Sequence, residues 1–366
     1  MKNSSVKTGT AFLVLFLLVS TVSCKKEQVS SRYGPSPETK DTIIRGADLS
    51  FLPEIEANGV LFSNSSGKQA TALEILAEAG MNTVRLRLWH SPENNHSSLA
   101  EVKLFADRIK AMRLKLWITV HYSDTWADPG HQQKPAAWNQ LSLQTLRDSV
   151  YIYTSQVVRL LKPDILQVGN EINHGFLWPD GHSMHREHFL QLLEAGCKAV
   201  RDHSDDCLIM LHYAGFKEAD IFFNEVNSLD YDLMGISYYP IWHGKDLNLL
   251  QSSISALSKK HQKKLVIAET AYPFTLQWND HTHNVLGEVA QTIAEFSPSP
   301  DGQQLFLEEI KRISTHKPLL SGFAYWGAEW IAFKGAEATD GSSWENQALF
   351  DFSNKALPAI SAFARN

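Results

Sequence analysis

The chain has 366 residues, 43% of them hydrophobic, so it can bury the core of one large α/β domain or of two smaller domains. The formal net charge is −6 and no basic tract offsets it, which argues against a nucleic-acid partner. Ten Trp and ten Tyr residues offer flat aromatic faces of the kind that stack on planar or ring-shaped ligands.

The N-terminal segment has the pattern of an export signal. Lys2 and Lys7 precede an apolar run over residues 11–19, and small residues lead from that run to Cys24. The run is too short to cross a bilayer, so residues 1–23 are predicted to be a secretory signal peptide. A cysteine at this place resembles a bacterial lipoprotein cleavage site, which predicts a lipidated Cys24 as the mature N-terminus; plain secretion is the alternative. Residues 24–40 then form a polar, flexible tether, and the folded domain spans residues 41–366.

Strand-like apolar runs alternate with amphipathic stretches of helical spacing along this domain. The predicted strands are residues 43–49, 83–89, 114–121, 165–170, 208–213, 233–239, 265–269 and 321–326. The predicted helices are residues 69–79, 99–112, 143–161, 187–202, 219–226, 247–261 and 303–313, with a closing helix near the C-terminus. Eight alternations without a break in composition predict an α/β fold, a single (β/α)8 TIM barrel. An open doubly wound sheet is the alternative, and it is disfavoured because no Gly-rich phosphate loop follows the first strand.

Three strand-to-helix connections are long, namely residues 122–142, 171–186 and 270–302. In a barrel such connections build the active face, so their length predicts a deep cleft.

Two predicted strands end in a glutamate. Leu166-Gln-Val-Gly-Asn-Glu-Ile172 and Leu265-Val-Ile-Ala-Glu-Thr270 share this pattern. Cleavage of a glycosidic bond with retention requires two carboxylates, one as acid/base and one as nucleophile, and a pair of strand-terminal glutamates can supply both. We therefore predict that Glu171 is the proton donor and Glu269 the nucleophile.

Hydrogen-bonding side chains stand at the other strand ends: Asp48, Arg85, Arg87, His121, Asn170, His212, Tyr238 and Trp326. We expect Asn170 to bind the sugar hydroxyl next to the reacting carbon. Arg87, Tyr238 and His121 are expected to keep Glu269 ionised, and the charge of Glu269 is expected to raise the pKa of Glu171. A structural ion-pair cluster is the alternative reading of these charges.

Sugar-binding residue types gather in His121-Tyr-Ser-Asp-Thr-Trp-Ala-Asp-Pro129, where Asp124 and Asp128 can bind hydroxyls and Trp126 can stack. Trp326 is the expected platform under the reacting sugar, whereas Trp330 fits wall packing equally well. A metal site is the rival interpretation, but no ligand pair has helical or CxxC-like spacing, so we predict none here. His182, His185 and His188 do not share one helical face and are expected to be solvated loop residues.

Cys197 and Cys207 are the cysteines that follow the predicted signal segment. They could pair in an oxidising compartment, or both could be buried thiols.

Several motifs together resemble glycoside hydrolase family 53, the endo-β-1,4-galactanases. They are Gly46-Ala-Asp-Leu-Ser50, Val84-Arg-Leu-Arg-Leu-Trp89, the stretch 121–129, Val168-Gly-Asn-Glu-Ile172, Gly235-Ile-Ser-Tyr-Tyr-Pro-Ile-Trp242, Ala268-Glu-Thr-Ala-Tyr-Pro273 and Ser343-Trp-Glu-Asn-Gln347. The resemblance implies a clan A barrel and retaining endo-hydrolysis of β-1,4-galactan in galactan and type I arabinogalactan, the side chains of pectin. It implies the same roles for Glu171 and Glu269, and that chemistry requires no cofactor.

Some members of that family hold a structural calcium through an Asp-x-Asp-x-His-x-Asn run. The comparable stretch here is Trp278-Asn-Asp-His-Thr-His-Asn284, which keeps Asp280 and Asn284 of the pattern, and Glu345 is a further candidate ligand. The resemblance therefore allows a structural calcium here, although the stretch matches the ligand pattern only in part.

Two other functions compete with this one. The barrel could be a non-catalytic, glycan-binding surface lipoprotein, or a retaining hydrolase of another β-1,4-polysaccharide such as mannan or xylan. We expect a monomer that is exported and anchored at the bacterial cell surface, with membrane contact only through the lipid on Cys24.

Overall fold

The computed structural model describes residues 42–365. The predicted signal peptide, Cys24 and the tether lie outside the described residues. Within residues 42–365, none of the helices has the length and apolar character that a membrane span requires.

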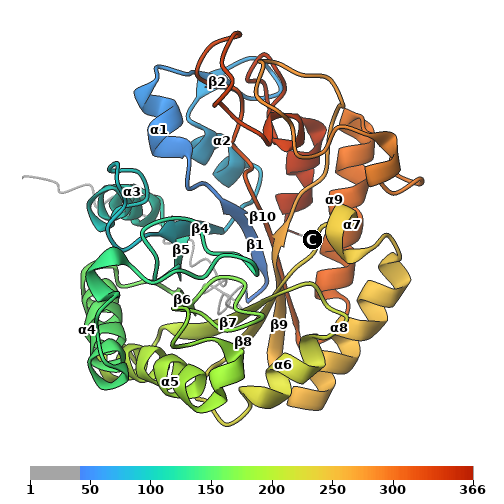
Figure 1. Cartoon of the computed structure of the whole chain (residues 1–366). Coiled ribbons are helices and arrows are strands. Elements are labelled where there is room, and N and C mark those ends of the chain that lie inside the picture. The colour runs from blue at the N-terminus through green and yellow to red at the C-terminus, as the bar shows by residue number, and fades with distance from the viewer. Residues whose placement is uncertain (1–41, 366) are drawn as a thin grey trace, which may run out of the picture. The chain divides into compact units, whose positions relative to one another are not determined.

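Eight parallel strands close into a barrel in the order β1-β10-β9-β8-β7-β6-β5-β4, with β1 next to both β4 and β10 (Figure 1). They are β1 (Ile44–Asp48), β4 (Thr83–Leu88), β5 (Lys115–Val120), β6 (Ile165–Val168), β7 (Leu208–Ala214), β8 (Leu233–Ser237), β9 (Lys264–Thr270) and β10 (Leu320–Tyr325). The predicted (β/α)8 barrel is confirmed, and each strand lies within two residues of its predicted bounds.

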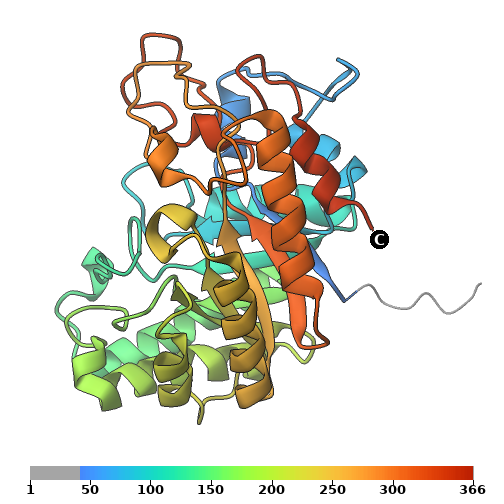
Figure 2. The same cartoon turned by 90° about the vertical axis from the view of Figure 1, so that its right-hand side faces the viewer.

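Helices surround the barrel, as α8 and α9 do outside β9 and β10 in Figure 2. The helices are α1 (Leu52–Ala57), α2 (Ala72–Glu78), α3 (Leu99–Ala111), α4 (Leu143–Leu161), α5 (Arg186–His203), α6 (Ala219–Glu225), α7 (Pro240–His243), α8 (Leu247–His261) and α9 (Pro300–Thr315). Several begin where a short polar side chain accepts a backbone N–H of the first turn, as Ser98, Ser142 and Asp246 do.

Two helix predictions need correction. The helix predicted from residue 69 begins at Ala72, because Thr71 forms a capping box with Glu74. Gln69 and Ala70 are instead strand β3 (Gln69–Ala70), which pairs with β2 (Phe62–Ser63). The expected closing helix is a short 3-10 helix, Pro358–Phe363, that packs on α9.

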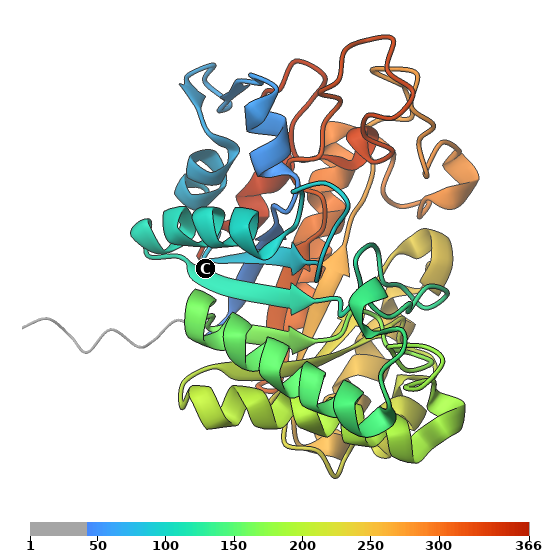
Figure 3. The same ribbon diagram turned by 60° about the vertical axis from the view of Figure 1, so that its left-hand side comes forward.

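The barrel interior is layered. One apolar cluster draws side chains from seven of the strands: Ile44, Trp117, Ile165, Met210, Leu233, Val266, Ala268 and Ala324. The guanidinium carbon of Arg85 lies 5.5 Å from the centre of the buried Trp117 ring, so a buried cation borders this apolar cluster. Parallel strands point their carboxyl ends the same way, and Figure 3 shows the long loops gathered at that end.

The loops after the first and last strands are joined at the rim. The Phe51 N–H donates to the buried Glu329 carboxylate at 2.8 Å, and the Phe51 and Trp330 rings stack with centroids 3.8 Å apart. This contact joins loops that are 278 residues apart in sequence.

Cys197 and Cys207 are free and buried, so the second of the two alternatives, buried thiols, is confirmed. Burial raises the pKa of each thiol to about 12.

Candidate active site

A cleft of about 540 Å³ opens at the carboxyl ends of the strands. It is lined by Arg85, Arg87, His121, Trp126, Ala127, Asp128, Pro129, Asn170, Glu171, Ala214, Tyr239, Trp242, His243, Glu269, Val285, Trp326, Trp330, Ser343 and Trp344. Both glutamates therefore face one cavity that is rich in aromatic side chains.

Glu171 is aimed by the turn that follows β6. Gly169 has φ of +80° and Glu171 itself has φ of +47°, a left-handed conformation that is uncommon outside glycine and clusters at functional sites. The Glu171 N–H donates to Nδ1 of His212 at 3.3 Å, and Ser237 Oγ donates to the Glu171 carboxylate at 2.5 Å. His212 thus lies beneath the acid and fixes its backbone.

Glu269 is held by two donors, one from β4 and one from the segment that follows β8. Arg85 Nη2 donates to Glu269 Oε1 at 2.6 Å, and the Tyr239 hydroxyl donates to Oε2 at 2.9 Å. Arg85 also binds Asp48 Oδ2 at 2.6 Å and Asn170 Oδ1 at 2.8 Å. One guanidinium therefore ties together the carboxylates that end β1 and β9.

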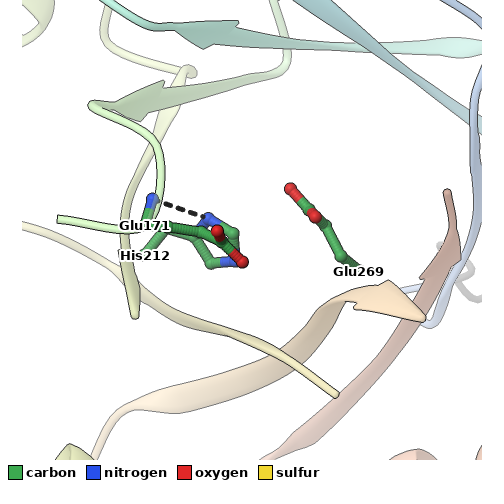
Figure 4. Close-up of side chains that lie close together, drawn as sticks. All are labelled: Glu171, His212 and Glu269. Atoms are coloured by element: carbon green, nitrogen blue, oxygen red, sulfur yellow. Dashed lines mark hydrogen bonds between the residues drawn. The ribbon is translucent and has the colours of Figure 1, made fainter. Parts of the chain in front are cut away.

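The two glutamate side chains point toward one another across the cleft (Figure 4). An oxygen of each, with a ring nitrogen of His212, lies within 4.8 Å of the others. Desolvation and the charge of Glu269 raise the pKa of Glu171 to about 8. Burial also raises the pKa of Glu269, and Arg85 and the Tyr239 hydroxyl oppose that rise. Because Glu269 contacts the Arg85 cation and the Tyr239 hydroxyl, whereas within residues 42–365 Glu171 accepts only the Ser237 hydroxyl, Glu269 is the carboxyl that ionises first.

Three expected partners of Glu269 do not contact it. Arg87 donates instead to Ser97 Oγ and contacts His96. The Tyr238 hydroxyl donates to the Gly244 carbonyl. Nδ1 of His121 accepts the Ala127 N–H. The predictions for Arg87, Tyr238 and His121 as partners of Glu269 were therefore wrong. Arg85 and Tyr239 take that place, and burial ranks ahead of Glu269 as the cause that raises the pKa of Glu171.

The remaining predicted residues divide into two groups. Asp128, Trp126, Asn170 and Trp326 line the cleft with Arg87 and His121. Asp48, Asp124, His212 and Tyr238 do not line it and act through other residues; Asp124, for example, accepts the Ser91 and Ala136 N–H groups and shapes the loop.

Sequence reasoning missed Tyr239, Trp242 and Trp344 in the cleft. The signal for Tyr239 was its place beside Tyr238 at the end of a strand. Tyr238 was chosen because it stood at the end of the predicted strand. Strand β8 ends earlier, at Ser237, and a register shift to β9 lies there, so Tyr239 and not Tyr238 reaches Glu269.

One group of His, Asp, Glu and Cys side chains in residues 42–365 has the spacing of a metal site, and it is Glu171, His212 and Glu269. Its carboxylates are already bound by Ser237, Arg85 and Tyr239. His182, His185 and His188 do not form such a group.

The calcium candidates lie together in a separate, buried place. Asp280 Oδ2, Asn284 Oδ1 and Glu345 Oε2 are buried oxygens without a hydrogen-bond partner. Asn284 Nδ2 donates to the other oxygen of Glu345 at 3.3 Å, which brings two of these side chains into contact. A Cβ at Gly341 would lie 2.3 Å from Asp280 Oδ2, so glycine leaves room beside that oxygen. Carboxylate and amide oxygens are the ligands that Ca²⁺ prefers, so these residues fit the ion.

Comparisons with known proteins agree with the motifs. The model of glycosyl hydrolase family 53 matches residues 44–363. An arabinogalactan endo-β-1,4-galactanase of Cellvibrio japonicus is 34% identical over 87% of this chain and 89% of its own length. An endo-β-1,4-galactanase of Bacillus subtilis is 31% identical over 87% of this chain and 85% of its own length.

Solved structures give the same result. A family 53 catalytic domain of Ignisphaera aggregans superposes with a TM-score of 0.84 and 35% identity, covering 90% of this chain and 98% of that domain. A fungal β-1,4-galactanase superposes with a TM-score of 0.78 and 30% identity, covering 88% and 99%. From the motifs, the barrel and these matches, the chain belongs to glycosyl hydrolase family 53.

Proposed function

We propose that this protein is an endo-β-1,4-galactanase that cleaves galactan and type I arabinogalactan with retention of anomeric configuration. The observation that carries the proposal is the facing pair Glu171 and Glu269 in the cleft of a family 53 barrel. The galactanase names of the relatives support the choice of substrate. Trp126 and Trp242 line the cleft and are partly exposed, at 37% and 55%, which suits stacking along an extended sugar chain.

The first chemical step is glycosylation. A Glu269 carboxylate oxygen attacks the anomeric carbon while Glu171 gives its proton to the leaving glycosidic oxygen, so that bond breaks as the ester bond to Glu269 forms. The raised pKa of Glu171, about 8, keeps it protonated at neutral pH for this role.

The second step is hydrolysis of that ester. Glu171, now ionised, takes a proton from water, and the oxygen of that water attacks the anomeric carbon and releases Glu269. Arg85 and Tyr239 then receive the returning carboxylate in its ionised form. Asn170 accepts from Arg85 through Oδ1 and donates one Nδ2–H to the Ala127 carbonyl, so its second Nδ2–H is the one that can bind the adjacent sugar hydroxyl.

A panel of polysaccharides tests this assignment. Reducing ends should appear with β-1,4-galactan and arabinogalactan and stay near background with mannan, xylan and cellulose, and NMR should detect the β-anomer first. Preferred release from another polymer would replace the substrate while keeping the mechanism. Binding of galactan without release of reducing ends would favour the non-catalytic lipoprotein instead.

We also propose that the enzyme is a monomeric lipoprotein, anchored through Cys24 at the bacterial cell surface. The support is the sequence pattern before Cys24, and the polar tether would let the cleft reach an insoluble polymer.

We further propose that Asp280, Asn284 and Glu345 hold a structural calcium. The unpartnered buried oxygens support this, and Glu345 directly follows Trp344 of the cleft wall. The ion would stabilise the loop and take no part in bond cleavage.

A further inference from the structure

We propose that Arg87 is a positioning residue for Trp126. Its guanidinium supports one face of the indole, so that the other face is held toward the cleft for stacking on a sugar. The inference rests on the proposed function, because the sugar that stacks on Trp126 is taken to be part of the galactan substrate.

Arg87 is a buried cation in an aromatic cage. The residue is only 2% exposed, and its guanidinium carbon lies 4.0 Å from the ring centre of Trp126, 4.6 Å from Phe51 and 4.7 Å from Trp89. Among residues 42–365, no carboxylate lies within salt-bridge distance of it. A desolvated cation without a paired anion is costly, so the three π-faces add to the stabilisation that the more distant Asp48 and Glu329 carboxylates give its charge.

Two side chains outside the cleft fix the guanidinium. Nε of Arg87 donates to Ser97 Oγ at 3.0 Å, and Nη2 lies 2.6 Å from Nε2 of His96. His96 is itself stacked on Phe51, with centroids 5.3 Å apart and an interplanar angle of 24°. Arg87 is therefore held from the loop that follows its own strand, β4, without the help of Trp126.

Trp126, in contrast, depends on its neighbours. It lies on the long loop after β5, and within the described part of the chain its indole N–H has no protein acceptor. Its closest ring neighbour, Trp89, meets it edge-on at 5.5 Å, and Trp326 lies 6.1 Å away. The Arg87 guanidinium, 4.0 Å from the ring centre, contacts one face of the ring, and the residue as a whole is still 37% exposed. Such a ring presents its remaining face to the cleft.

The alternative is that Arg87 binds the sugar directly, because it also lines the cleft. His96 separates the two roles, since it touches Arg87 and does not line the cleft. H96F keeps a ring on Phe51 but removes the acceptor of Arg87, whereas H96Q restores an acceptor oxygen. R87M removes the cation and keeps most of the chain length.

The test is a double-mutant cycle on galactan. We expect R87M to raise KM by about 3- to 30-fold, the range that the loss of a desolvated cation–π contact supports, and H96F to raise KM by less. In both variants kcat should change by less than about twofold. H96Q should restore the wild-type KM. In a W126A background, R87M and H96F should have no further effect. An R87M effect that persists in full in W126A would establish direct sugar binding and overturn the proposal, as would wild-type KM in both H96F and R87M.

A second readout needs no substrate. In protein labelled with 5-fluorotryptophan, the ¹⁹F resonance that disappears in W126F reports on Trp126 alone. It should broaden or shift in H96F and return in H96Q. An unchanged resonance in H96F and R87M would overturn the positioning role. This outcome does not depend on activity, so it can be told apart from a failure of the proposed function, in which wild-type protein would not cleave galactan. If R87M does not fold, the H96F and H96Q pair still decides the question.

Discussion

Arg85 Nη2 lies 2.6 Å from the carboxylate of Glu269, and Nη1 of the same guanidinium lies 2.6 Å from Asp48. All three side chains are almost fully buried. The nucleophile is thus one end of a three-member charge network, and the arginine is what makes two buried carboxylates tolerable.

Replacing Arg85 should be costly for the fold as well as for activity. R85M leaves two buried carboxylates without their cation, so the free energy of unfolding should fall by about 3–5 kcal/mol. R108M is the matched control, because Arg108 pairs with Glu56 at the surface and that pair should contribute less than about 1 kcal/mol. Urea unfolding of both variants measures the difference, and similar losses would contradict the role of Arg85.

The two glutamates should fail in different ways. E269A should abolish turnover of every substrate, because no nucleophile remains. E171A should lower kcat/KM on galactan by about 10²- to 10⁴-fold, yet still release an activated aryl leaving group that needs no proton. Steady-state rates on galactan and on an aryl galactobioside compare the two, and equal losses on both substrates in E171A would reject the assignment.

The pH profile of kcat/KM should be bell-shaped. Glu171 acts protonated and its pKa is raised to about 8, so activity should be retained at neutral pH and lost as the pH rises through about 8. Glu269 acts ionised and its pKa is also raised, so the acidic limb should lie above 4.5, the usual value for Glu. With the aryl substrate, E171Q should lose the alkaline limb and keep the acidic one. An alkaline limb that survives unchanged in E171Q must belong to another group.

Calcium removal should destabilise the protein. Treatment with EDTA should lower Tm and added Ca²⁺ should restore it, because the ion stabilises only the folded state. E345Q removes one charged ligand and should make Tm insensitive to both treatments. S353A, which alters an exposed serine in another loop, is the control that should respond like wild type. If neither EDTA nor Ca²⁺ changes the Tm of the wild-type protein, Asp280, Asn284 and Glu345 do not hold a structural calcium.

Cell fractionation tests the anchor. Wild-type protein should partition with membranes and into detergent, because a lipidated N-terminus with two or more acyl chains inserts stably. C24A should become soluble or stay uncleaved, with unchanged activity per folded molecule. Entirely soluble wild-type protein with another mature N-terminus would reject the lipoprotein proposal and leave the hydrolase proposal intact.

The barrel could be predicted because its causes are local. Alternating apolar strands and amphipathic helices with polar caps, such as Leu143–Leu161 after Ser142, are visible in the sequence itself. The glutamates were also predictable, because Glu171 lies three residues after the buried strand β6 and Glu269 is the last residue but one of the buried strand β9.

The partners of the glutamates were less accessible to sequence reasoning. Arg85 and Arg87 are two residues apart on one strand and face the same side, so alternation does not tell which of them reaches Glu269. The answer depends on which groups surround each guanidinium: Arg85 pairs in register with Asp48 and binds both Asp48 and Glu269. Trp242 and Trp344 were missed for a related reason, since they lie outside the strands in segments whose course is set by distant contacts.

The hydrogen bond from Phe51 to Glu329 also constrains the order of folding. Its partners are 278 residues apart, and β1 pairs with β10 over a similar distance. Closing so long a loop is entropically costly and slow, and it cannot begin until β10 has been synthesised. A nascent chain that already carries Glu171 and Glu269 therefore still lacks one wall of its barrel. Activity should appear only after the last strand is in place, so truncation before residue 320 should yield an inactive chain with β1 exposed along one edge.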